Sequence, residues 1–243
     1  MRTVLIIPAR YNSSRLKGKP LMEIEGKPMV WWVYQQMKKS ARVDEIYVAT
    51  DSEKIQGVCA DYGMNCMMTS PDHKTSTERL YEVSKSIPGD IYICVNGDEP
   101  LLEAEVMEQV IPENLEGFFV SNLMTAILHP VEAVDDSNIK VVTDTKGNAL
   151  FMSRSPIPHP KASILFSYYK HLGVLAYSPN ALRFFAETPR GPLEAVEDIN
   201  ELRFIEHGKK VKMIPVEAET LSVDTAKDLE YVRQVIRERS LGR

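Results

Sequence analysis

The chain has 243 residues, with 29 basic and 34 acidic side chains and a net charge of −5. A hydrophobic fraction of 44% and a charged fraction of 26% are typical of globular proteins and exclude a disordered or fibrous chain. The acidic total argues against a general nucleic-acid-binding protein, which needs a positive face for phosphate.

The three cysteines, Cys59, Cys66 and Cys94, are far apart and form no Cys-x-x-Cys pair. This usage predicts neither a disulfide framework nor a structural zinc site, and it favours a reducing compartment. The apolar stretch at the start of the sequence is too short for a signal peptide, and no segment approaches the ~18 apolar residues of a membrane span. We therefore expect a cytoplasmic protein that does not associate with membranes.

The first half of the chain alternates short apolar segments with amphipathic ones. Ser76 is followed three residues later by Arg79 rather than by Glu, so we expect no capping box at the start of the third helix. Strand–helix alternation predicts a mostly parallel sheet with helices on both faces, which binds ligands beyond the carboxyl ends of its strands. The expected strands are residues 4–7, 45–50, 65–69 and 90–96, and the expected helices are residues 28–37, 52–62, 75–87 and 101–113.

The second half is less regular, because several expected strands follow one another without helices between them. We interpret residues 127–177 as a hairpin insert, a lid or dimerisation arm, within a single domain of residues 1–243. The expected strands are residues 119–127, 139–144, 149–153, 169–177 and 211–218, and the expected helices are residues 179–187, 193–206 and 225–239.

A polar loop, residues 8–20, follows the first expected strand. Small residues let backbone N–H groups approach an anion, and basic side chains neutralise it, so this loop suits a triphosphate. Neither G-x-x-x-x-G-K-[ST] nor G-x-G-x-x-G is present, and an exposed loop without a ligand is the alternative. The loop combines Arg10, Arg15, Lys17 and Lys19 with Ser13, Ser14 and Gly18.

Two aspartates each follow an expected strand. Asp98 ends the most strongly predicted strand, and Asp224 lies between the last expected strand and the last helix. Both could instead cap helices. If the fold brings them together, the two carboxylates can complete one Mg²⁺ site with phosphate and water.

These segments together resemble the CMP-Kdo synthetases, the 3-deoxy-manno-octulosonate cytidylyltransferases. Each motif alone is moderately specific, but their order along nearly the whole chain is strongly so. The matching segments are Ile7-Pro8-Ala9-Arg10-Tyr11 with Arg15-Leu16 and Gly18-Lys19-Pro20-Leu21, Val48-Ala49-Thr50-Asp51, Asp72-His73, Thr77-Glu78-Arg79-Leu80, Gly97-Asp98-Glu99-Pro100, Ser153-Arg154, Pro156-Ile157-Pro158, Lys170-His171 with Gly173, Val223-Asp224-Thr225, and Asp228-Leu229.

The resemblance implies a Rossmann-like α/β fold of the nucleotide-diphosphosugar-transferase type, with a mixed, mostly parallel sheet. It implies a Mg²⁺-dependent homodimer in which a sugar-acid hydroxyl attacks the α-phosphate of CTP and pyrophosphate leaves. The product, a CMP-sugar, would serve bacterial surface polysaccharide synthesis. The site residues that it implies are Arg10, Ser13, Arg15 and Lys19 on the triphosphate, Thr77 and Arg79 near the cytidine, Asp98 and Asp224 on Mg²⁺, with Lys19 and both aspartates catalytic, and Asn96, Arg154, His171, Asn200 and Glu201 on the sugar side.

The departures from the family pattern fall mainly on the sugar side. Asn96 replaces the usual Gln, and Asn200-Glu201 replaces Glu-Gln. A carboxylate at residue 201 suits a substrate amine or an extra hydroxyl. The acceptor is therefore expected to be Kdo or a variant such as 8-amino-Kdo. Three further departures are Thr75-Ser76-Thr77 for Ser-Gly-Thr, Ser222 for Gly and Ala226 for Pro.

Several alternatives stay open on the sequence alone. The protein could be a nucleotidyltransferase of the same fold that uses another nucleotide or a sugar phosphate. It could also be a nucleotide-binding regulator without turnover, although both aspartates are present. His171 could be a buried strand histidine, and Arg154 could serve a lid or dimer contact.

Overall fold

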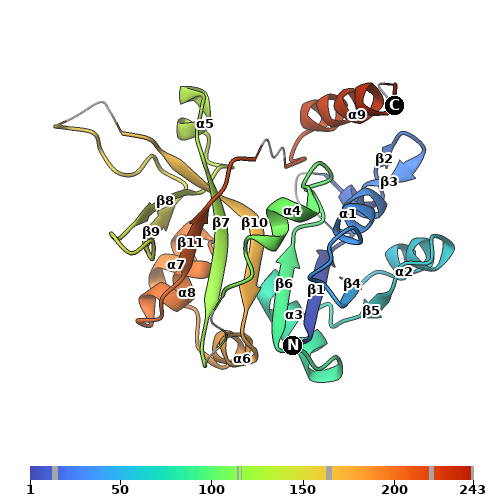
Figure 1. The fold of residues 1–243 in the computed structure, drawn as a ribbon, viewed down its shortest axis with the longest axis horizontal. Coiled ribbons are helices and arrows are strands. Elements are labelled where there is room, and N and C mark those ends of the chain that lie inside the picture. Colours follow the sequence, from blue (N-terminus) through green and yellow to red (C-terminus); the bar gives the residue numbers. More distant parts are fainter. Residues whose placement is uncertain (13–15, 114, 116, 163–165, 219–221, 242–243) are drawn as a thin grey trace.

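The structure is a computed structural model that describes residues 1–12, 16–113, 115, 117–162, 166–218 and 222–241. The expected alternation holds in the first half, where parallel strands are joined by helices (Figure 1). Its elements are β1 (Thr3–Ala9), η1 (Lys19–Leu21), β2 (Glu23–Ile24), β3 (Lys27–Pro28), α1 (Met29–Met37), β4 (Glu45–Thr50), α2 (Glu53–Asp61), β5 (Cys66–Met68), α3 (Ser76–Ser86), β6 (Ile91–Val95) and α4 (Ala104–Glu108).

The second half adds antiparallel strands and a group of short helices. Its elements are β7 (Val120–Ala126), α5 (Pro130–Val134), β8 (Lys140–Thr143), β9 (Ala149–Ser153), β10 (Tyr169–Tyr177), α6 (Pro179–Glu187), α7 (Pro192–Glu197), α8 (Glu201–Glu206), β11 (Lys212–Pro215) and α9 (Ala226–Leu241).

The central sheet has the strand order β11-β7-β10-β6-β1-β4-β5. Strands β6, β1, β4 and β5 are parallel neighbours, β11 is parallel to β7, and β10 runs antiparallel to both β6 and β7. The sheet is therefore mixed but mostly parallel along this path, as expected. β8 and β9 form an antiparallel hairpin that joins the sheet through β10, which is the expected hairpin insert. β10 itself is a central strand rather than part of a protruding arm.

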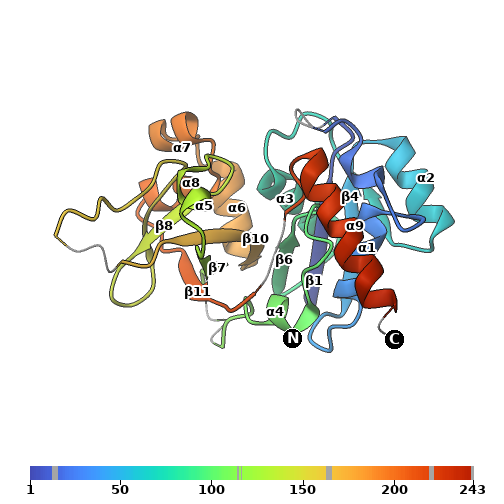
Figure 2. The ribbon, with the colours of Figure 1, turned by 90° about the horizontal axis from the view of Figure 1, so that it is seen from above.

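Helices cover both faces of the sheet. Alternate residues of β1 point to opposite sides, so Leu5 packs in one core with α1, α2 and α4, while Ile6 packs in the other with α3, α6 and α8. Figure 2 shows the two halves side by side, with α9 lying across the half that contains β1 and β4. A third, smaller core of α9, β2 and Leu101 fixes that helix in place.

Three expected elements differ from the structure. α3 does have a capping box, because its N-cap is Thr75 rather than Ser76 and the partner is therefore Glu78. Residues 101–113 form only the short helix α4. Residues 193–206 form two helices, since Asp198 adopts a left-handed conformation with φ of 54° that ends α7.

Candidate active site

Lys19 bridges the two aspartates that the sequence predicts as functional. Its Nζ lies 2.8 Å from Asp98 Oδ2 and 3.1 Å from Asp224 Oδ1. Burial opposes the charged form of Lys19, but the two carboxylates outweigh it and raise the Lys19 pKa. The fold therefore unites three side chains that lie up to 205 residues apart in the sequence.

Each member of this group has a definite support in the backbone. Gly18 precedes η1 with φ of 74°, and a Cβ there would lie 3.3 Å from the Tyr11 ring, so a glycine suits the turn that presents Lys19. Asp98 is the third residue after β6 and does not cap a helix, because α4 begins at Ala104 with Glu103 as its N-cap.

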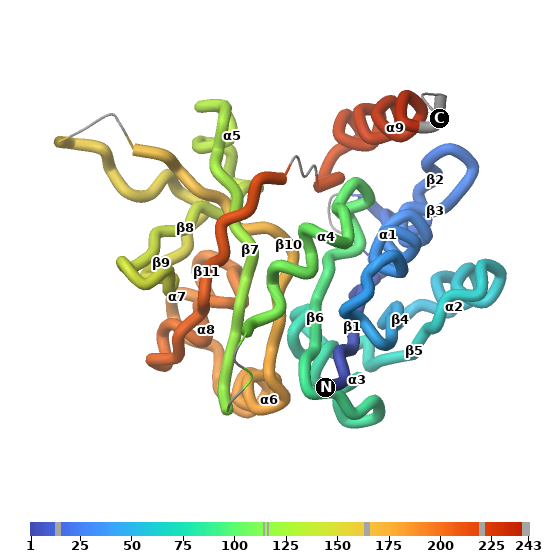
Figure 3. The backbone as a smooth tube through the Cα atoms, in the orientation of Figure 1, coloured from blue at the N-terminus to red at the C-terminus, as the bar shows by residue number. Residues whose placement is uncertain are grey.

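Asp224 reaches the site because α9 packs on the first half of the molecule. Figure 3 traces the chain from β11 on one half to α9 on the other. The Val223 amide donates to Asp98 O at 2.9 Å, which ties the segment before α9 to the loop after β6. Thr225 accepts a hydrogen bond from the Asp228 amide, so the capping role falls to Thr225 and leaves the Asp224 carboxylate to Lys19.

A pocket of about 390 Å³ lies beside this group. Arg10 is exposed at its edge, where Nη2 donates to Lys74 O at 3.3 Å. Ser13 and Arg15, both predicted to bind the triphosphate, lie outside the described residues. The pocket is lined by Pro8, Arg10, Asn12, Lys19, Pro20, Gly97 and Asp98.

Thr77 and Arg79 are buried on α3 and do not line this pocket. Thr77 Oγ1 lies 3.4 Å from the Tyr177 hydroxyl. Arg79 donates to Thr69 and, at 3.0 Å, to Asp51 Oδ2. Burial lowers the Arg79 pKa, although Asp51 opposes that shift. The structure therefore places Arg79 in a buried ion pair with Asp51.

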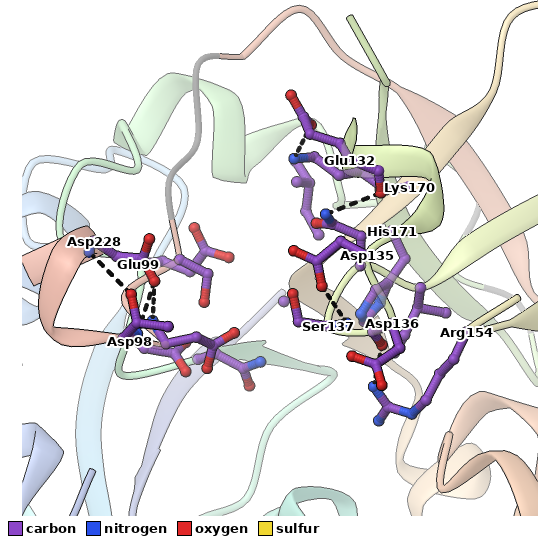
Figure 4. Close-up of a pocket in the computed structure, with 18 residues that line it drawn as sticks. Asp98, Glu99, Glu132, Asp135, Asp136, Ser137, Arg154, Lys170, His171 and Asp228 are labelled. Carbon is purple, nitrogen blue, oxygen red and sulfur yellow. Dashed lines mark hydrogen bonds and ion pairs between the residues drawn. The ribbon is translucent and has the colours of Figure 1, made fainter. Parts of the chain in front are cut away.

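A larger pocket of about 660 Å³ lies on the other side of the aspartate pair. Figure 4 shows Asp98, Glu99 and Asp228 on one wall, facing Glu132, Lys170, His171, Asp135, Asp136, Ser137 and Arg154 on the other. Three of the predicted sugar-side residues, Asn96, Arg154 and His171, line this pocket. The same pocket also reaches Asp98 and Asp224, so the predicted metal and sugar residues share one cavity.

His171 lines this pocket with a partly exposed imidazole ring. Its Nδ1 is buried without a hydrogen-bond partner in the described structure. Burial and the nearby charge of Arg154 lower the His171 pKa to about 4. The ring is therefore neutral near pH 7 and can exchange hydrogen bonds with a hydroxyl group.

Arg154 makes several contacts with main-chain carbonyls. Nε donates to Glu197 O at 2.8 Å, Nη1 to Asp136 O at 2.9 Å, and Nη2 to Asp198 O at 3.3 Å. The guanidinium thus links β9 to the end of α7 and to the loop before β8. This geometry fixes the pocket wall, whether or not Arg154 also contacts a ligand.

Asn200 and Glu201, the remaining predicted sugar-side residues, do not line the pocket. Asn200 Nδ2 donates to Ser76 Oγ at 3.4 Å. Glu201 is only 4% exposed. Its burial, and to a smaller degree the charge of Glu194, raise its pKa to about 7.

Sequence reasoning missed several acidic groups in the large pocket. Glu99 is buried with Oε2 lacking a hydrogen-bond partner in the described structure, and burial together with Asp98 raises its pKa to about 8. Glu132 forms an ion pair with Lys170 at 2.7 Å. Glu99 and Lys170 are next to predicted site residues in the sequence, and this proximity could have identified them. No sequence feature pointed to Glu132, because the short helix α5 was not expected.

This arrangement suits a reaction between a phosphate-bearing ligand and a second, polar ligand. The smaller pocket presents Arg10 and Lys19, the larger one presents hydrogen-bonding groups and more carboxylates than cations, and Asp98 lines both. None of the chemistry requires an activated serine or cysteine, because phosphoryl-type transfer depends on positioning and charge neutralisation. Among the residues described, no helix is both long and apolar enough to cross a bilayer.

Comparison with known proteins agrees with this geometry. A family model described as cytidylyltransferase matches residues 4–211. A 3-deoxy-manno-octulosonate cytidylyltransferase of Chlorobaculum tepidum is 36% identical over 98% of this chain and 99% of its own. The enzyme of the same name from Escherichia coli is 38% identical over 97% of this chain and 96% of its own.

Solved structures give the same result. CMP:2-keto-3-deoxy-manno-octonic acid synthetase complexed with CTP superimposes with a TM-score of 0.90 at 36% identity, covering 98% of this chain and 100% of the other. The inositol-1-phosphate CTP transferase from T. maritima, at 14% identity and a TM-score of 0.70 over 98% of this chain and 95% of its own, shares the fold alone. The chain belongs to the CMP-Kdo synthetase family and is a cytidylyltransferase.

Proposed function

We propose that this protein is a Mg²⁺-dependent cytidylyltransferase that couples CTP to a 3-deoxy-ulosonic acid, either Kdo or a variant such as 8-amino-Kdo. The observation that carries the proposal is the Lys19 bridge between Asp98 and Asp224, at the junction of the two pockets. The smaller pocket would hold the triphosphate, and the larger one the sugar acid. The relatives named for 3-deoxy-manno-octulosonate and the neighbour complexed with CTP support this division.

In the proposed reaction, a hydroxyl of the sugar acid attacks the α-phosphate of CTP and pyrophosphate leaves. Lys19 and Arg10 would neutralise the phosphates, and Ser13 and Arg15 remain predicted phosphate ligands. His171, neutral at pH 7, lines the larger pocket and would hydrogen-bond the sugar through its imidazole ring. The protein's contribution is to hold the two anions in line at short distance.

The residues present fit a magnesium ion. Asp98 Oδ1 is buried without a hydrogen-bond partner in the described structure, although Oδ2 of the same carboxylate is bound to Lys19. No group of three or more His, Cys, Asp and Glu side chains in the described residues is arranged for a metal. Two carboxylates nevertheless suffice for Mg²⁺, which commonly takes one or two carboxylates and completes its shell with phosphate and water. Asp98 and Asp224 would hold the ion, which would stabilise charge on the phosphates.

The choice of acceptor would depend on Asn96 and Glu201. Asn96 lines the large pocket, whereas Glu201 is buried on α8 and does not line it. Its carboxylate, partly ionised near pH 7, would act on an amino-substituted sugar by charge at a distance and not by contact. Glu201→Gln should therefore shift the preference from amino toward hydroxy substrates, measured as the ratio of kcat/KM for 8-amino-Kdo and Kdo. An unchanged ratio would refute this part of the proposal.

The central test is product analysis. Mass spectrometry of reactions with CTP, Mg²⁺ and a panel of 3-deoxy-ulosonic acids should detect a CMP-sugar, and pyrophosphate release should favour CTP over UTP, ATP and GTP. Asp98→Asn and Asp224→Asn should nearly abolish turnover in folded protein, whereas Asp61→Asn on exposed α2 should not. Tight CTP binding without pyrophosphate release would instead indicate a non-catalytic regulator.

A homodimer in the cytoplasm, supplying surface polysaccharide synthesis, completes the proposal. Support for the dimer comes from exposed apolar residues of the insert: Leu128 is 78% exposed, and Val131 and Val134 are each 70% exposed. The three free cysteines suit a reducing compartment. Light scattering should give a dimer mass for the wild type and a lower mass for Val131→Asp. A wild-type monomer would contradict the dimer.

A further inference from the structure

Lys140 is a fully buried lysine whose role the reaction does not explain. It begins β8 and has no exposed surface. Its Nζ donates to two main-chain carbonyls, Asp135 O at 2.8 Å and Asn138 O at 2.6 Å. Burying an ammonium group is costly, and an apolar side chain of similar length would fill the same space more cheaply. Packing alone therefore does not explain why a lysine is present at residue 140.

The two carbonyls belong to a loop that forms one wall of the large pocket. Residues 135–139 all line that pocket. Figure 4 shows Asp135, Asp136 and Ser137 of this loop beside His171 and Arg154, opposite Asp98 and Glu99. The shape of this loop thus determines the distance between its wall of the pocket and the carboxylates of Asp98 and Asp224.

The same loop also supports the two sugar-side residues that face the pocket. Arg154 Nη1 donates to Asp136 O at 2.9 Å, and the His171 amide donates to Ile139 O at 3.0 Å. Lys140 occupies the centre of this arrangement, because its partners across the neighbouring strands are Lys170 on β10 and Ser153 on β9. These two partners directly adjoin His171 and Arg154 in the chain. A movement of the loop would therefore be transmitted to both residues.

We propose that Lys140 is a positioning residue for the acceptor sugar. Its ammonium donates hydrogen bonds to both ends of the 135–138 loop and so fixes the positions of Arg154, His171 and the pocket wall. This inference rests on the proposed function of the large pocket. It assigns Lys140 no contact with substrate. Its loss should act on acceptor binding and alignment while leaving the nucleotide pocket, which lies on the other side of Lys19, unchanged.

The test is steady-state kinetics with Kdo, CTP and Mg²⁺ on three variants. Lys140→Met removes the donors, and Lys140→Gln keeps a neutral donor. Lys212→Met is the matched control, because Lys212 also begins a strand and donates to a turn carbonyl, Lys146 O, but lies exposed and outside the pocket. We expect Lys140→Met to raise the KM for Kdo about tenfold or more with the KM for CTP within about twofold. Lys140→Gln should be intermediate, and Lys212→Met should resemble the wild type.

Equal increases in both KM values, or a lower melting temperature with an unchanged KM for Kdo, would show that Lys140 is only structural and would overturn the inference. If neither Lys140 variant folds, hydrogen exchange of the wild type decides. Slow exchange of the loop amides before Kdo is added supports a preformed wall, and fast exchange that slows only with Kdo refutes it. A wild type that forms no CMP-sugar from any acceptor would instead refute the proposed function.

Discussion

Replacing Glu201 with glutamine should change how the stability of the protein depends on pH. Glu201 is 4% exposed, and burial raises the pKa of its carboxyl group from the usual 4.5 to about 7. Between these values the folded protein retains a proton that the unfolded chain has released. The free energy of unfolding contributed by this group therefore falls as the pH rises through this window.

The magnitude follows from the two pKa values. Their difference, at ~1.4 kcal/mol for each pH unit, corresponds to about 3 kcal/mol lost between roughly pH 4 and pH 8. Relaxation of the site and entry of water make this figure an upper limit. Glutamine has nearly the same shape and stays neutral. The variant should therefore match the wild type near pH 4 and be more stable than it near pH 8, by up to about 3 kcal/mol.

Urea unfolding at intervals from pH 4.5 to 8.5 measures this difference directly. Glu187→Gln serves as the control, because Glu187 is exposed at the end of α6 and should show no such trend. A difference between wild type and Glu201→Gln that stays within ~0.5 kcal/mol across the range would refute the reasoning. It would mean that the Glu201 carboxyl ionises normally in the folded protein.

Three further substitutions test local features. In Gly173→Ala the new Cβ would clash with the Asn96 side chain. Steady-state kinetics should therefore show a raised KM for the acceptor, and an unchanged KM would contradict the close packing. Arg203→Met removes both 2.7 Å hydrogen bonds to the buried Glu194 carboxylate and leaves it only the longer ion pair with Arg190 at 3.6 Å. Urea unfolding should show a loss of up to about 3 kcal/mol, largely recovered when Glu194→Gln is added. Thr75→Ala removes the capping box of α3 and should cost about 1 kcal/mol in thermal unfolding, while Thr75→Ser should cost less.

Much of the fold could be predicted because local patterns sufficed. The apolar run of β1 and the amphipathic pattern of α6 indicate their structures without reference to distant residues, and α6 has the predicted bounds. The predictions were wrong where tertiary contacts override local pattern. Residues 193–206 bend at Asp198, since Arg203 folds back to Glu194 and ties α8 against α7.

The site divides in the same way. Lys19, Asp98 and Asp224 could be named from the sequence, because charged and small residues after a strand mark the carboxyl edge of a parallel sheet. The contact of Lys19 with both aspartates could not be predicted from the sequence, because it depends on the packing of α9 against the first half of the chain.

Residue types, the order of strands and helices, and the resemblance to a family follow from the sequence alone. Which side chains are buried depends on the tertiary structure. It buried Glu201 and raised its pKa, left Nδ1 of His171 without a partner in the described structure, and enclosed Lys140 beneath the loop that lines the pocket. The physical reason is that pKa values and unmet hydrogen bonds depend on desolvation and on neighbours distant in the chain, and a linear sequence specifies neither.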